Sequence, residues 1–275
     1  FLKTKEWKEP NSNLFNQFGQ TSVVFFFIIT AFLFTNKLIN SKNNPIKWTN
    51  YIKSRFLRLF PAYFLSICLV FLIVAILSGF EIKDTFFGLL GNSFSWFFFT
   101  IAGPNDLNAI KNTYLINAGV AWSLPFEWMF YFLLPIIGLF FKIKVNYKTM
   151  LAFTLTFVAI LLINRPIIKQ FLPFLGGILS AVLLQNDSKF KFLKQKGFSI
   201  IAILLLAISV YFFNSGKDVI PIIISPILFL IIASGNSFFG LLTATFSRKL
   251  AQVTYSFYFL KGIILFIVFN FFFGL

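Results

Sequence analysis

The chain has 275 residues, of which 58% are hydrophobic and 44 are phenylalanine, whereas soluble domains contain about 45–50% apolar residues. A soluble core of this size could not bury so much apolar surface. Most charged residues lie between apolar runs of roughly 20 residues, so the sequence predicts an all-α, polytopic bundle of transmembrane helices. A membrane β-barrel does not fit, because its strands alternate polar and apolar residues.

The formal net charge of +16 is interpreted as the excess of basic residues that membrane proteins carry in their cytoplasmic loops. Lysine and arginine gather in the connectors, as is typical of cytoplasmic loops. No basic helix is interleaved with aromatic residues, so we expect the lipid bilayer, and not nucleic acid, as a partner. The sequence has no histidine and a single cysteine, Cys68. This excludes a disulfide framework and a cysteine metal site, and it removes the commonest general base.

Nine apolar segments are predicted to form the membrane helices of one domain covering residues 1–275. They lie at residues 20–36, 57–79, 84–101, 118–141, 149–164, 167–185, 197–213, 218–236 and 250–275. The chain opens with a polar stretch that resembles a loop cut from a longer protein, so we expect the domain to be incomplete at its N-terminus.

Two connecting regions bear on topology. Segment 84–101 is interrupted by Gly88 and Gly91, and it either spans the membrane or is a re-entrant piece buried in protein. If it does not span, the lysine-rich loops 142–148 and 189–196 fall on the same side as the basic connector 37–58; if it spans, they fall opposite. Residues 103–118 are interpreted as a solvated linker, with a substrate-facing loop as the alternative.

The most unusual residue is Glu127, near the middle of the apolar segment 118–141. A charged group at that depth costs at least ~2.5–3.5 kcal/mol, so such residues are rare and often functional. Ser123, Glu127 and Tyr131 are spaced four apart and therefore share one helical face. This face offers a hydroxyl, a carboxylate and a phenol to a polar group inside the membrane. A structural hydrogen bond to a neighbouring helix is the alternative interpretation.

Two further clusters could carry chemistry. Arg55 and Arg58 are three residues apart on one helical face at the edge of the membrane, where two guanidinium groups can bind phosphates. On spacing alone, ordinary anchoring at the membrane surface is the favoured interpretation of this pair. Lys261 is, with Glu127, the only ionisable acid or base well inside an apolar run. It could extend to the membrane surface, or it could form an ion pair with Glu127.

Taken together, four stretches resemble the acyltransferase-3 family of membrane O-acyltransferases. They are residues 19–34 (GQTSVVFFFIITAFLF), 55–63 (RFLRLFPAY), 122–135 (WSLPFEWMFYFLLP) and 255–258 (YSFY). Their order matches the second helix, the start of the third helix, the most specific signature and the start of the last helix of that family. Each stretch alone is a weak signal, whereas the four in order are a strong one.

The resemblance implies about ten helices in the intact protein and the multi-pass topology of a bacterial inner-membrane protein. It implies transfer of an acyl group, usually acetyl, from a cytoplasmic thioester such as acetyl-CoA to a hydroxyl of a cell-envelope or extracellular sugar. Arg55 and Arg58 would contact the phosphates of acyl-CoA, and Glu127 would shape the central site. The implied acceptor site comprises Trp122, Ser123, Tyr131, Tyr255 and Tyr258.

The chain departs from the family at two places. The resemblance places the family's catalytic histidine in its first helix, and we expect this chain to begin just after that helix. Where the last helix usually carries a histidine, this chain has Lys261. Glu127 and Lys261 are the remaining candidates for proton transfer, and neither is an obvious replacement. Because general acid–base help is worth about 10²–10⁴-fold, we expect the chain as given to have little activity.

Two other functions remain open from the sequence. A transporter or flippase for a polysaccharide precursor would use the same polar residues to line a path, with the proline- and glycine-broken segments as hinges. A non-catalytic membrane subunit is the second alternative. The arginine pair separates the enzyme from the flippase, because only the enzyme needs a donor site.

Overall fold

The computed structural model describes residues 13–41, 46–164 and 168–273, and within these ranges no β-strand occurs. Ten α-helices follow one another: α1 (Asn13–Asn40), α2 (Trp48–Leu77), α3 (Phe86–Phe97), α4 (Leu124–Phe140), α5 (Tyr147–Asn164), α6 (Leu172–Leu183), α7 (Asp187–Phe190), α8 (Lys196–Phe212), α9 (Val219–Ala233) and α10 (Thr245–Ile267). The predicted all-α fold is confirmed. Each of the nine predicted apolar segments contains one α-helix, and α7 is a short addition between two of them.

The prediction of nine membrane crossings is not confirmed. Four helical stretches in the described residues are long and apolar enough to cross a membrane: Asn16–Asn40, Trp48–Leu77, Val120–Phe140 and Thr245–Phe272. A bent pair, Ser188–Lys194 and Lys196–Phe212, meets at 74° and gives a fifth if it crosses as one unit. The other apolar helices fall short of the ~20 residues that a crossing needs. An apolar run can end in a bend or in a short helix, so the number of apolar runs alone does not establish the number of crossings.

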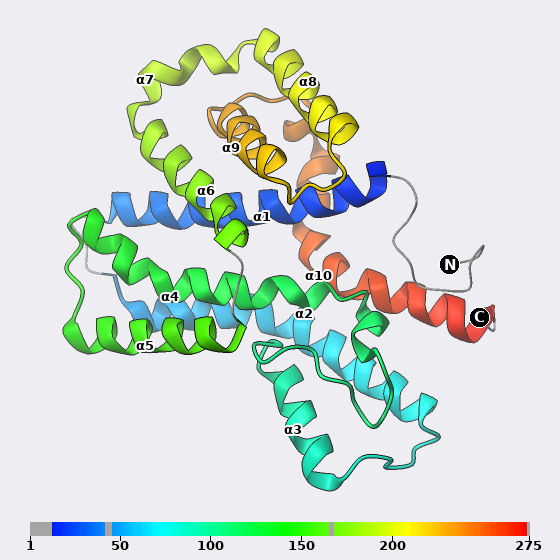
Figure 1. The fold of residues 1–275 in the computed structure, drawn as a ribbon. Coiled ribbons are helices and arrows are strands. Elements are labelled where there is room, and N and C mark those ends of the chain that lie inside the picture. The colour runs from blue at the N-terminus through cyan, green and yellow to red at the C-terminus, as the bar shows by residue number, and fades with distance from the viewer. Residues whose placement is uncertain (1–12, 42–45, 165–167, 274–275) are drawn as a thin grey trace.

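Helix α1 lies between two groups of helices (Figure 1). On one side the ring of Phe34 contacts Tyr131 of α4, with the ring centroids 5.4 Å apart. On the other side Phe27 stacks on Phe174 of α6 at 4.6 Å, and Phe32 meets Phe229 of α9 at 5.1 Å. A helix segment covered on both sides must be apolar all round, which explains the nearly uninterrupted apolar run at residues 23–34 of α1.

The close approach of α1 and α6 depends on a glycine. A Cβ atom added at Gly177 would overlap the backbone carbonyl oxygen of Ile28 and lie 2.7 Å from the Cβ of Ala31. Small residues at such positions let two helix backbones pack closely inside a membrane. The Gly176–Gly177 pair, which the sequence showed only as an interruption of an apolar run, is therefore a packing surface.

Contacts along the helices show which connectors share an end of the molecule. α4 and α6 run parallel to α1, because Phe27 lies beside Phe126 and Phe174, and Gln185 at the far end donates a hydrogen bond to Asn36. α2 is antiparallel to them, since its first turn places Tyr51 against Tyr131. The connectors 37–58, 142–148 and 189–196 therefore meet at one end, which we call the basic end.

The opposite end gathers the N-terminal half of α1 and the connectors 78–85 and 213–218. Gln17 and Gln20 of α1 bond Phe213 and Ser215, respectively. Helix α3 has only 12 residues, and the helix directions bring the three lysine-rich connectors to one end, which is the arrangement expected if segment 84–101 does not span the membrane. Figure 1 shows α3 beside the second half of α2, away from the layer of α1, α4 and α5.

The interpretation of residues 103–118 as a solvated linker holds only in part, because exposed residues alternate with buried ones. Leu107, Thr113 and Ile116 are buried, and the Oγ1 of Thr113 accepts a hydrogen bond from the amide of Leu107. The side chain of Asn108 ties this segment to the end of α2 by accepting from the amide of Lys83. Buried backbone must find partners, and here polar side chains that resemble a solvated loop in the sequence supply them.

Candidate functional site

The centre of the site is a hydrogen-bonded pair on α4. The phenol of Tyr131 donates a hydrogen bond to Oε1 of Glu127, one helical turn away, and each of the two residues is only 2% exposed. Ser123, just before α4, is also buried, and its Oγ lies 3.3 Å from the hydroxyl of Tyr258 on α10. The row of three polar side chains predicted from the sequence is thus present, with Glu127 and Tyr131 directly bonded.

Aromatic rings from three helices enclose this pair. Phe34 of α1, Tyr51 of α2 and Trp128 of α4 all present their rings to Tyr131, at centroid distances of 5.4, 6.1 and 5.8 Å. The hydroxyl of Tyr51 and the Nε1 of Trp128 are buried, and neither has a hydrogen-bond partner among the described residues. Unpaired buried donors are costly and call for an explanation. Two such donors close to a buried carboxylate are suited to bind a polar group.

Tyr51 is a residue of this site that was not predicted from the sequence. It lies four residues before Arg55, so it shares the face of α2 that carries the arginine pair. This spacing could have indicated that Tyr51 belongs to the site. A tyrosine near a membrane surface is, however, more often an interfacial anchor.

Arg55 and Arg58 face the same region from α2. The guanidinium carbon of Arg55 lies 4.9 Å from the centroid of the Phe34 ring, and both arginines interact electrostatically with Glu127. No ion pair or hydrogen bond among the described residues joins either guanidinium to the carboxylate. Arg55 is half-buried and Arg58 is exposed. The Nε of Arg55 donates to the Oγ of Ser54 at 3.4 Å, and the other guanidinium nitrogens of the pair can bind an anionic ligand that approaches from the basic end.

Helix α10 completes the site with two tyrosines. The hydroxyl of Tyr258 donates to the carbonyl oxygen of Val120 at 3.0 Å, and that of Tyr255 donates to the carbonyl oxygen of Leu59 at 3.4 Å. These bonds attach α10 to the start of α4 and to α2. The two tyrosines thus support the site from α10, and the hydroxyl of Tyr258 also reaches Ser123.

The structure does not form the hypothesised ion pair between Lys261 and Glu127. The Nζ atom of Lys261 lies 5.6 Å from the centroid of the Tyr258 ring, and no salt bridge with Glu127 occurs in the described residues. Lys261 is one turn beyond Tyr258 on α10, which directs its amine along its own helix. The ammonium group of Lys261 is stabilised there by the face of the Tyr258 ring.

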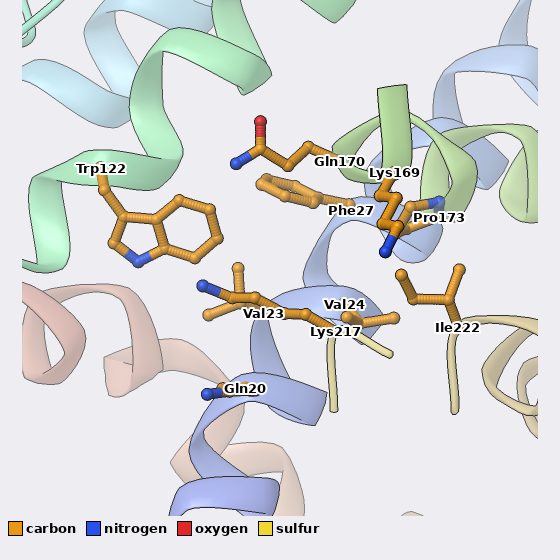
Figure 2. A pocket seen from close by; sticks show the side chains of 10 residues that line it. All are labelled: Gln20, Val23, Val24, Phe27, Trp122, Lys169, Gln170, Pro173, Lys217 and Ile222. Atoms are coloured by element: carbon orange, nitrogen blue, oxygen red, sulfur yellow. The ribbon is translucent and has the colours of Figure 1, made fainter. Parts of the chain in front are cut away.

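Trp122 is separated from the polar pair. Its ring contacts Phe27 and Phe126, at centroid distances of 6.3 and 5.9 Å, and the Nζ of Lys217 lies 3.8 Å from its centroid. Its partly exposed side chain lines a different pocket, shown in Figure 2. Of the five predicted acceptor residues, four gather around α4 and α10 and Trp122 faces this second space.

The site therefore offers one buried carboxylate, phenol and indole donors, and a pair of arginines at its basic end. Glu127 is the only charged side chain that is buried among the described residues. Within the same residues no three histidine, cysteine, aspartate or glutamate side chains gather as a metal ion would require. The arrangement can bind a phosphate-bearing ligand from one end and can transfer a proton at its centre.

Comparison with known proteins gives one match. A family model for acyltransferase family 3, described as an acyltransferase domain, matches residues 2–275. No curated protein and no solved structure matches the chain. The match covers the whole described structure, including α2, α4 and α10, the three helices that carry the candidate site.

Proposed function

Because the chain belongs to the acyltransferase-3 family, we propose that it transfers an acyl group, acetyl being the simplest, between two substrates in a bacterial inner membrane. The donor is a cytoplasmic thioester such as acetyl-CoA. The acceptor is a hydroxyl of a cell-envelope or extracellular polysaccharide sugar. The observation that carries this proposal is the position of Glu127, buried on α4, with the guanidinium groups of Arg55 and Arg58 on α2 acting electrostatically on its carboxylate.

The distribution of charge supports a cytoplasmic donor. The basic end holds the lysine-rich connectors, and short loops rich in lysine and arginine are typically cytoplasmic. Arg55 lies within the first three turns of α2, and α2 starts at this end. A nucleotide-bearing donor that enters from the cytoplasm would meet Arg55 and Arg58 before it reaches Glu127. Arginine suits this role because its planar guanidinium can bind phosphate through two hydrogen bonds.

The proposed step is attack of a sugar hydroxyl on the thioester carbonyl carbon. Glu127 accepts the hydroxyl proton while the new C–O bond forms, the C–S bond then breaks, and the leaving thiolate takes up a proton. The product is an ester and a free thiol, so atoms and charges balance. The unpaired donors of Tyr51 and Trp128 are suited to stabilise the negative oxygen of the intermediate, which is often the largest contribution to catalysis.

The test is transfer of radiolabelled acetyl from acetyl-CoA to envelope glycan, in membranes from cells that express the complete reading frame encoding this chain. We expect Glu127→Gln to lower the transferred label at least about 100-fold, because it removes the proton acceptor. Glu81→Gln, at an exposed acid of the opposite end, should leave it unchanged. Absence of transfer by the unmodified protein, with acetyl-CoA binding intact, would reject the proposal.

A further inference from the structure

The hydroxyl of Tyr51 is buried and has no hydrogen-bond partner among the residues that the structure describes. Its ring is nevertheless held by three others, with centroid distances of 5.3 Å to Phe34, 5.9 Å to Trp48 and 6.1 Å to Tyr131. All three contacts are edge-to-face, a favourable geometry for aromatic pairs. An unpaired buried hydroxyl does not help the fold, so a role in the reaction better explains why a tyrosine stands here.

Tyr51 lies on the side of Glu127 that faces the basic end. It belongs to the first turn of α2, which starts at that end, and it contacts Tyr131, one turn closer to that end than Glu127. The Oγ of Ser54 donates to the carbonyl oxygen of Tyr51 at 2.8 Å and accepts from the Nε of Arg55. Tyr51 also interacts electrostatically with Arg55 and Glu127. A donor that enters from the basic end therefore passes Tyr51 on its way to the carboxylate.

The other unpaired donor, Trp128, occupies a different part of the site. Both donors contact the ring of Tyr131. The indole of Trp128 also meets Phe99 at a centroid distance of 5.2 Å, and Phe99 stacks on Tyr63 at 4.9 Å. Tyr63 lies farther along α2 than Tyr51, away from the basic end. Of the two donors, Tyr51 is therefore the one on the side from which the thioester arrives.

We propose that Tyr51 is a catalytic residue that gives its hydroxyl proton to the departing thiolate of the donor. This inference rests on the proposed function, in which the source of that proton is not assigned. The oxygen and the sulfur of the intermediate are bonded to the same carbon atom, so a hydroxyl that faces the oxygen is also close to the sulfur. The sulfur leads to the part of the donor that extends toward the basic end, where Tyr51 lies.

The proton transfers of this step balance. Glu127 accepts the proton of the sugar hydroxyl as the C–O bond forms. The C–S bond then breaks with its electron pair on sulfur, and the proton of Tyr51 forms the S–H bond. The phenolate regains a proton from the carboxylic acid of Glu127 by way of Tyr131, which contacts both residues. A carboxylic acid is ordinarily a stronger acid than a phenol or a thiol, so the overall transfer is downhill and both residues end as they began.

The test compares acetyl-CoA with its selenium analogue, acetyl-seleno-CoA, which keeps every other group of the donor. A leaving group of lower pKa departs more readily, and a selenol is more acidic than a thiol, so the selenolate can leave without a proton. Labelled acetyl transferred to envelope glycan is measured in membranes that contain the complete reading frame. With acetyl-CoA, we expect Tyr51→Phe to lower kcat at least about 100-fold and to change KM less than about twofold. With the selenium analogue, the loss in kcat should be less than about fivefold.

Two variants serve as controls. Trp128→Phe removes a donor to the carbonyl oxygen alone, so it should slow transfer from both donors by the same factor. Tyr147→Phe, at an exposed tyrosine, should leave both rates unchanged. Since the hydroxyl of Tyr51 has no partner among the described residues, its removal should not lower the unfolding temperature.

Three results would overturn the inference alone. Equal losses of Tyr51→Phe with the two donors would limit the hydroxyl to the carbonyl oxygen. Undiminished transfer from acetyl-CoA by this variant would remove the hydroxyl from the reaction. A lower unfolding temperature together with lost transfer would make its role structural. Absence of transfer by the unmodified protein would reject the proposed function, and this inference with it.

Discussion

Tyr131 donates its phenolic hydrogen to Glu127 one turn earlier on the same helix, and both side chains are buried. This is the only hydrogen bond that the described residues provide to the carboxylate. Two guanidinium groups, on Arg55 and Arg58, act on it electrostatically without touching it. A buried carboxylate has room for several more hydrogen bonds, so Glu127 is held in place yet remains open to a further partner.

Replacing Tyr131 tests how much its hydrogen bond to Glu127 stabilises the folded protein. We expect Tyr131→Phe to destabilise the protein by about 1–3 kcal/mol, because a buried acceptor loses its partner. Thermal unfolding in detergent, followed by size-exclusion fluorescence, would show the fall. Tyr147→Phe, at a tyrosine with 74% exposure, is the matched control and should have little effect.

The double variant Glu127→Gln, Tyr131→Phe tests whether the two side chains act as a pair. Residues in direct contact show coupling energies of about 0.5–3 kcal/mol. A coupling energy near zero would show that the bond does not contribute to stability.

The contact between α1 and α6 should tolerate no added methyl group. We expect Gly177→Ala to lower the stability by about 1–3 kcal/mol, since the methyl group overlaps the Ile28 carbonyl and forces the helices apart. Gly91→Ala is the control, because Gly91 is also helical and nothing lies within 4 Å of an added Cβ there. Equal unfolding temperatures for both variants would contradict the close packing described here.

Lys261 and Glu127 should behave independently. The amine of Lys261 lies over Tyr258 and forms no ion pair with the carboxylate. The effects of Lys261→Met and Glu127→Gln on stability should therefore add within about 0.5 kcal/mol. A larger coupling in the same unfolding measurement would restore the ion pair that we hypothesised from the sequence.

The shared position of the basic connectors can be tested by labelling. In a Cys68→Ser background, Lys144→Cys and Lys191→Cys should be protected from a membrane-impermeant maleimide added to intact cells. Lys83→Cys, at the opposite end, should react. Labelling of Lys144→Cys and Lys83→Cys to the same extent would place the α4–α5 connector on the wrong side.

The nine helix-bearing segments and the row Ser123, Glu127 and Tyr131 could be predicted because helix period and apolar run length are local properties. The lengths of the helices were less predictable, because an apolar run such as 84–101 contains only the 12-residue helix α3. The burial of polar residues within 103–118 could not be predicted either, because their partners are distant in the sequence, as the amide of Lys83 is for Asn108.

The binding partners of charged side chains were the least predictable. Lys261 and Lys217 both use aromatic faces that come from their own helix or from a distant segment. A pattern of charge indicates that a partner is required, but only the fold determines which one is within reach. Tyr51 entered the site for the same reason, since its place beside Tyr131 depends on how α2 crosses α4.

The central claim is that the arginine pair binds a thioester donor, and the most direct measurement is the affinity of the purified protein for acetyl-CoA. We expect saturable binding that Arg55→Gln and Arg58→Gln each weaken by roughly 10–100-fold, because each loses charge-assisted bonds to phosphate. Arg248→Gln, at an exposed arginine of α10, should leave the affinity unchanged. An unmodified protein that does not bind acetyl-CoA, or a pair of variants that bind it as well as the control, would contradict the account and favour the transport function.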